Sequence, residues 1–170
     1  RPVAILVDFT QYFSTKDRIL AEFWEKYKLD SITGSWDYFE PALFGYAAGK
    51  VIESFYEYSL TAQDKIVAQF HEWMTGSGIL YLNDRVPQIG TAFTTHATVV
   101  GRCIAGNNLP LYSKFDEYNG DAMASRFHVT AKHSLEHIAA VESDVFTTVS
   151  KLTANECSQF LLREPDVITP

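Results

Sequence analysis

The chain has 170 residues, of which 46% are hydrophobic and 21% charged, and its formal net charge is −7. This size and composition are typical of one folded domain with a hydrophobic core and argue against disorder. The negative charge, without a basic stripe, argues against nucleic-acid binding, and no apolar run approaches the ~20 residues of a membrane-spanning helix. Cys103 and Cys157 lie far apart, which favours reduced thiols in a cytoplasmic protein over a disulfide or a metal site.

The first third of the chain is predicted to contain one strand and two helices. The continuous apolar run of residues 3–7 (VAILV) is typical of a parallel strand buried on both faces. A helix with apolar residues at helical spacing follows it, and Pro41 suits the first position of a long second helix. Gly45 and Gly49 share one face of this second helix, which predicts close packing against a neighbouring element.

The rest of the chain alternates strands with helices. Strands are predicted at residues 65–70, 88–94, 144–149 and 166–169. A helix follows the first of these strands directly, another begins at about Val99, a third covers residues 122–141, and a fourth is capped by Ser150. This alternation predicts a single α/β domain over residues 1–170, with a mostly parallel sheet flanked by helices.

Polar residues follow the predicted strands at the points where they end. They are His71, Glu72, His96, Ser150 and Thr169. Because the carboxyl ends of parallel strands meet at one edge, where ligands bind in open α/β sheets, these residues are expected to lie at a common edge. Each alone is commonly a helix cap or a satisfied loop residue, but together they favour a binding site. The helices that start there offer free backbone N–H groups suited to an anion such as phosphate.

The motif HSLEH at residues 133–137 matches the H-x-x-E-H pattern of one class of zinc peptidases. Only Glu142 or Asp144 follows as a third ligand, and so short a match arises easily by chance. An exposed polar helix face is the favoured interpretation, and a zinc hydrolase remains an alternative. The sequence contains neither a glycine-rich dinucleotide-binding or P-loop motif nor a G-x-S-x-G nucleophile elbow.

Three segments of the chain resemble glycogen synthases of the animal, fungal and related bacterial type. They are FHEWMTGSGILYL, FTTHATVVGR and SDVFTTVSKLTANECSQFLLREPDVITP. Members of that family typically carry F-H-E-W-L-A-G, F-T-T-H-A-T-L-L-G-R and D-V-F-T-T-V-S-x-I-T in the same order. The resemblance covers residues 64–170 and, more weakly, residues 41–58 and the opening strand. The chain is therefore expected to be an internal fragment of the N-terminal, acceptor-side domain of such an enzyme, with a bacterial homologue as its expected source.

The resemblance implies a GT-B enzyme, in which two Rossmann-like domains face a cleft. Such enzymes transfer glucose with retention from a sugar nucleotide, normally UDP-glucose, to the non-reducing end of an α-1,4-glucan, without a metal or other cofactor. His96 looks like the histidine that lies against the transferred glucose, where a fixed dipole would stabilise the charge that develops at the anomeric carbon. Glu72 resembles an acidic residue that binds glucose hydroxyls, Arg102 resembles an arginine beside the cleft, and His71 belongs to the same motif.

The chain also departs from the family pattern. The glycine-rich loop and the C-terminal nucleotide-binding domain are absent from these residues, so the isolated fragment is expected to be inactive. Its parent is expected to be a cytoplasmic enzyme whose partners are the sugar nucleotide and glycogen, with neither nucleic acid nor membrane, and a homo-oligomer is compatible with it. The family often has Arg in place of His137, which weakens the zinc interpretation. The alternative is a non-catalytic carbohydrate-binding or assembly module with the same fold.

Overall fold

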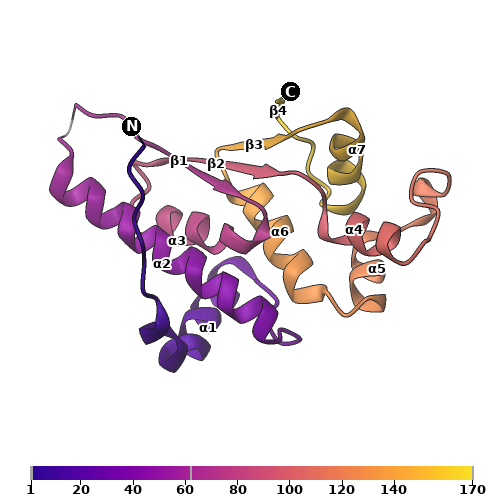
Figure 1. Cartoon of the computed structure of the whole chain (residues 1–170), viewed down its shortest axis with the longest axis horizontal. Helices are drawn as coiled ribbons and strands as arrows, with labels where there is room; N and C mark the ends of the chain where they lie inside the picture. The colour runs from indigo at the N-terminus through magenta and orange to yellow at the C-terminus, as the bar shows by residue number, and fades with distance from the viewer. Residues whose placement is uncertain (1, 62, 170) are drawn as a thin grey trace.

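The computed structural model describes residues 2–61 and 63–169. Within these residues, the strands form one all-parallel sheet in the order β1-β2-β3-β4 (Figure 1). They are β1 (Val67–His71), β2 (Gly90–Thr95), β3 (Val145–Thr148) and β4 (Val167–Ile168). Helices connect successive strands, as a parallel sheet requires. The predicted α/β fold with a parallel sheet is therefore confirmed.

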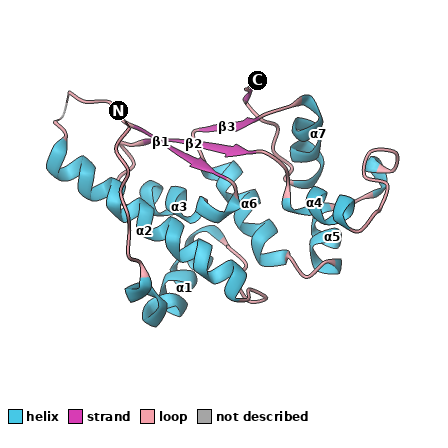
Figure 2. Cartoon of the chain, in the orientation of Figure 1, coloured by secondary structure: helices cyan, strands magenta, loops and turns pink. Residues whose placement is uncertain are grey.

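Helices flank the sheet on one face and at the carboxyl ends of its strands. They are α1 (Lys16–Tyr27), α2 (Trp36–Ser59), α3 (Ser77–Arg85), α4 (Val99–Gly106), α5 (Gly120–Arg126), α6 (Thr130–Glu142) and α7 (Lys151–Phe160), with 3₁₀ turns at Thr10–Thr15, Trp73–Thr75 and Phe115–Glu117. Figure 2 shows α2, α3 and α6 below the sheet, whereas α4, α5 and α7 lie beyond the arrowheads of the strands.

The main core lies between the sheet and the helices below it. Phe70, Phe93 and Phe146 are register partners on three neighbouring strands, and all three are buried. The rings of Phe93 and Phe146 lie 5.7 Å apart, centroid to centroid. A second, smaller cluster holds α4, α5 and α7 together; it consists of Val100, Ile104, Leu111, Met123, Ala124 and Phe160. The two clusters fix both sides of the sheet edge at which the strands end.

The predicted close packing at Gly45 and Gly49 is confirmed. A Cβ atom at Gly45 would overlap the hydroxyl of Ser77, and one at Gly49 would lie 2.8 Å from the ring of Tyr81. Both neighbours belong to α3. The two glycines therefore let the backbone of α2 approach α3, which sets the position of the segment that follows β1.

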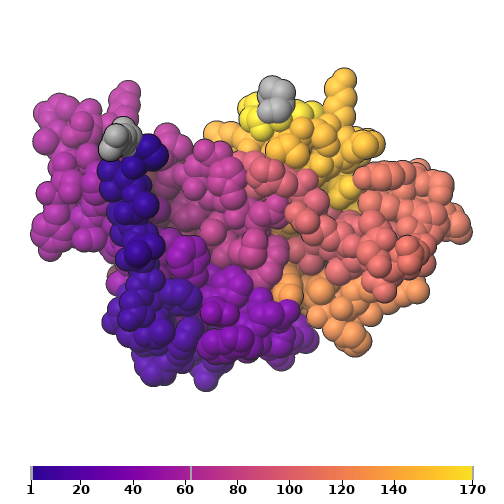
Figure 3. Space-filling model, in the orientation of Figure 1, coloured from indigo at the N-terminus to yellow at the C-terminus, as the bar shows by residue number. Residues whose placement is uncertain are grey.

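Two predictions for the first part of the chain are wrong. Residues 3–7 form no strand, and Figure 3 shows them as a strip on the surface, with Val3 88% and Leu6 99% exposed. An apolar run becomes a strand only beside a pairing partner, and the described residues place none next to it. Pro41 lies inside α2, which begins at Trp36. The helix tolerates this proline because the buried neighbours Ala42 and Leu43 hold it against the core.

Two predicted helices are also divided in the structure. The helix expected directly after β1 starts only after a turn at Glu72 and the 3₁₀ turn Trp73–Thr75. The helix expected at residues 122–141 consists of α5 and α6, separated where His128 takes a left-handed conformation with φ = 58°. Residues in this conformation end helices, and Asn, Asp and His adopt it more readily than most others. None of these corrections moves the strand ends.

Candidate functional site

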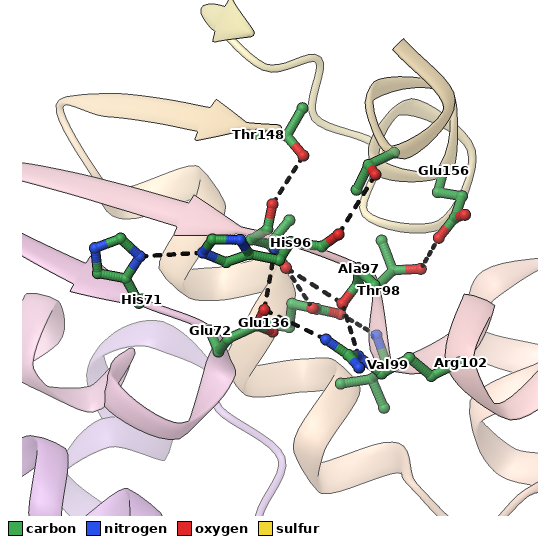
Figure 4. Close-up of polar contacts among 12 residues, drawn as sticks. His71, Glu72, His96, Ala97, Thr98, Val99, Arg102, Glu136, Thr148 and Glu156 are labelled. Atoms are coloured by element: carbon green, nitrogen blue, oxygen red, sulfur yellow. Dashed lines mark hydrogen bonds and ion pairs between the residues drawn. The ribbon is translucent and has the colours of Figure 1, made fainter. Parts of the chain in front are cut away.

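His71 and His96 come together at the carboxyl edge of the sheet. His71 ends β1 and is the register partner of Thr94, so the chain leaving β2 carries His96 alongside it. The His71 Nδ1 and His96 Nε2 atoms lie 3.2 Å apart, and the two rings are stacked at 29° (Figure 4). Both imidazoles are exposed. One ring must donate and the other accept, so the contact fixes the orientation of both histidines.

Glu72 connects this pair to Arg102. Its Oε1 atom accepts a hydrogen bond from the backbone N–H of His96 at 3.1 Å, and it lies 3.5 Å from Nη2 of Arg102. The Glu72 side chain is 15% exposed and that of Arg102 is 61% exposed. The carboxylate is thus held in the wall of the site, whereas the guanidinium of α4 is open to solvent and can reach an anionic or hydroxylated ligand.

The backbone of Glu72 is strained. Its dihedral angles are φ = 63° and ψ = 161°, a region that is almost restricted to glycine and costs on the order of 1–3 kcal/mol. Hydrogen bonds hold it there, because Glu72 N donates to the Thr94 carbonyl at 2.9 Å and Thr75 N donates to the Glu72 carbonyl at 3.2 Å. Such strain clusters at functional sites, and here it directs the carboxylate under His96.

Ser150 and Thr169 do not touch this cluster. Ser150 caps α7 as predicted, because its hydroxyl accepts a hydrogen bond from the N–H of Thr153 at 3.1 Å. The Thr153 hydroxyl in turn donates to the carbonyl of His96 at 3.4 Å. Thr169 donates its hydroxyl to the Thr148 carbonyl at 3.3 Å. These residues therefore support the sheet edge, and the Thr153 bond uses one of the two lone pairs of the His96 carbonyl.

Two buried glutamates lie beneath the same edge, and neither was predicted from the sequence as part of the site. Glu136 and Glu156 are 0% and 5% exposed. The Oε2 atom of Glu156 accepts from the Thr98 hydroxyl at 2.9 Å. Burial raises the pKa of Glu136 to about 8, since the charged form loses its hydration. The only sequence signal is a glutamate among apolar residues of a helix. That pattern does not show which face of the helix other elements cover.

The prediction of an anion site at the start of α4 is wrong. The N–H of Val99 donates to Glu136 Oε2 at 2.9 Å, and that of Gly101 donates to the Thr98 hydroxyl at 3.0 Å. These two N–H groups at the start of the helix therefore already have partners within the protein and are not free for a phosphate.

The exposed polar face predicted for HSLEH is also wrong. His133 and Glu136 are buried because α6 packs against α3, α4 and α5. The two imidazoles have separate partners: His133 Nε2 lies 3.3 Å from Asp121, and His137 Nδ1 lies 2.7 Å from the Leu161 carbonyl, to which it donates. Across residues 2–61 and 63–169, no group of three His, Cys, Asp or Glu side chains is arranged to bind a metal ion, and no helix there is long and apolar enough to cross a bilayer.

An all-parallel sheet with a polar cluster beyond its strand ends defines the class of this protein as Rossmann-like α/β. The family model described as glycogen synthase matches residues 1–170. The chain belongs to the glycogen synthase family, whose members are glycosyltransferases.

Curated relatives agree with this assignment. The chain is 32% identical to the liver glycogen (starch) synthase of Rattus norvegicus over 99% of its own length, and 38% identical to the glycogen (starch) synthase of Dictyostelium discoideum over 77%. It is 41% identical to the liver enzyme of Homo sapiens over 62%. The chain spans only 15–24% of the length of these relatives. They come from animals and Dictyostelium, so a bacterial source stays a prediction.

Proposed function

We propose that the chain is part of the N-terminal, acceptor-side domain of a cytoplasmic glycogen synthase with the GT-B architecture. The enzyme transfers glucose with retention from UDP-glucose to the non-reducing end of an α-1,4-glucan. The observation that carries this proposal is the cluster of His71, Glu72, His96 and Arg102 at the carboxyl edge of the sheet, in a chain that matches the family throughout.

Each residue of the cluster has a distinct role in the proposed reaction. The exposed imidazole of His96 donates to or accepts from a hydroxyl of the transferred glucose, and the His96 carbonyl dipole stabilises the positive charge that develops at the anomeric carbon. Glu72 accepts from a glucose hydroxyl and holds the His96 backbone through its N–H. Arg102 supplies a fixed cation beside the cleft, and His71 orients the His96 ring.

A non-catalytic carbohydrate-binding or assembly module is the alternative. Family membership over the whole chain favours the synthase. A binding module would also have no need for the ordered histidine pair and the carboxylate of Glu72 beside it. The strained backbone at Glu72 supports the same choice, since a passive fold could relax this position with glycine.

The longer enzyme is expected to incorporate glucose from UDP-glucose into glycogen, whereas the chain of 170 residues alone is expected to incorporate none. The second Rossmann-like domain would supply the donor phosphate contacts, and without it the charge of the leaving group is not stabilised. Radiolabelled transfer with UDP-glucose and ADP-glucose, run side by side, measures both activity and nucleotide choice. Transfer by the isolated chain, or no transfer by the longer enzyme with either donor, would refute the proposal.

A further inference from the structure

The turn that presents His96 is braced from below by Glu136 of α6. Glu136 Oε1 accepts from the Thr95 hydroxyl at 3.1 Å, and Glu136 Oε2 accepts from the Val99 N–H at 2.9 Å. One carboxylate therefore binds both ends of residues 95–99 (Figure 4). The two partners lie 41 and 37 residues away in sequence, so the brace exists only in the folded chain.

Other hydrogen bonds hold the same turn from its second side. The Thr148 hydroxyl donates to the Thr95 carbonyl at 2.8 Å, and the Thr98 hydroxyl donates to Glu156 at 2.9 Å. These contacts come from β3 and α7, whereas the brace comes from α6. His96 is thus an exposed side chain on a turn whose backbone is fixed from three elements, which is the arrangement that a precisely placed catalytic group needs.

Glu136 occupies a position that is costly for a carboxylate. It is 0% exposed, and burial raises its pKa although its two hydrogen-bond donors and the Arg102 cation act in the opposite direction. Burying a carboxyl group costs free energy unless hydrogen bonds offset its lost hydration. The two hydrogen bonds of Glu136 both go to residues 95–99, which points to a role in holding this turn.

We propose that Glu136 is a positioning residue for glucosyl transfer, which holds residues 95–99 in the conformation that directs His96 at the substrate. This inference rests on the proposed function. Leucine has a similar volume but no acceptor atom, so Glu136→Leu removes the hydrogen bonds to both the Thr95 hydroxyl and the Val99 N–H. Glu136→Leu therefore loosens both ends of the turn without emptying the core.

The test compares Glu136→Leu with Glu142→Leu in the longer enzyme. Glu142 is the last residue of the same helix, and its side chain does not contact the turn in the described hydrogen-bond network, so it is a matched control. Glu136→Leu is expected to lower kcat about 10–100-fold, with the KM for UDP-glucose within about threefold, because misplacement of a catalytic group by about 1 Å costs on the order of 100-fold. A purely structural role would lower the amount of folded enzyme and leave kcat per folded molecule unchanged.

Amide hydrogen exchange gives a second measurement that does not depend on activity. Glu136→Leu is expected to speed exchange in peptides that cover residues 95–99 and to leave residues 90–94 of β2 protected. A kcat equal to that of Glu142→Leu, or unchanged exchange at residues 95–99, overturns the positioning role. If wild type and the control both transfer no glucose, the proposed function fails, and the exchange at residues 95–99 still decides whether Glu136 holds the turn.

Discussion

His96→Ala in the longer enzyme is expected to lower kcat at least about 100-fold and to leave the protein folded. The substitution removes the imidazole that contacts the transferred glucose and keeps the backbone carbonyl, and loss of one preorganised hydrogen-bonding group from such a site costs about 100–1,000-fold. The backbone bonds of residue 96, from its N–H to Glu72 and from Thr153 to its carbonyl, do not depend on the imidazole and remain in the variant. Glucosyl transfer and thermal unfolding, measured on the same preparation, separate the two effects.

His128→Asn is the control for this experiment. His128 is an exposed histidine in the turn between α5 and α6, and Asn tolerates its left-handed conformation. This variant is expected to keep kcat within about twofold of wild type. If His96→Ala also kept near-normal turnover, the role assigned to His96 would be wrong.

Phe93→Ala is expected to destabilise the fold by about 3–5 kcal/mol, the usual cost of truncating a buried phenylalanine. Phe93 is 0% exposed and lies between its register partners Phe70 and Phe146 in the centre of the sheet. The cavity would border three strands and the helices below them. Chemical denaturation followed by fluorescence measures the change in the free energy of unfolding.

Phe55→Ala is the matched control, because Phe55 is 48% exposed on α2. It is expected to change the free energy of unfolding by less than about 1 kcal/mol, as surface substitutions usually do. Equal effects of the two substitutions would show that the sheet core lies elsewhere.

Local signals in the sequence predicted most of the fold. Apolar runs bounded by polar residues predicted the strands of the sheet. Ser150 indicated the start of α7, and the spacing of Gly45 and Gly49 indicated close packing between helices. The failures have a common physical cause. Residues 3–7 have strand composition but no pairing partner, and Glu136 has a polar side chain that three packed helices cover. Neither outcome is encoded within a local window.

The candidate site could be predicted only in part from the sequence. The ends of parallel strands meet, so His71, Glu72 and His96 were expected at one edge, and the structure brings them into contact. The strained backbone of Glu72 and the brace from Glu136 depend on hydrogen bonds between segments far apart in the chain. A local sequence pattern does not show which distant residues form hydrogen bonds with each other.

A crystal structure of the longer enzyme with UDP-glucose or its products would show whether His96 contacts the transferred glucose. A glucose hydroxyl is expected within about 3.5 Å of the His96 imidazole, with the anomeric carbon facing the His96 carbonyl. Glu72 and Arg102 are expected to line the same side of the sugar. A glucose bound away from this sheet edge, with His96 still paired to His71 and open to solvent, would contradict it.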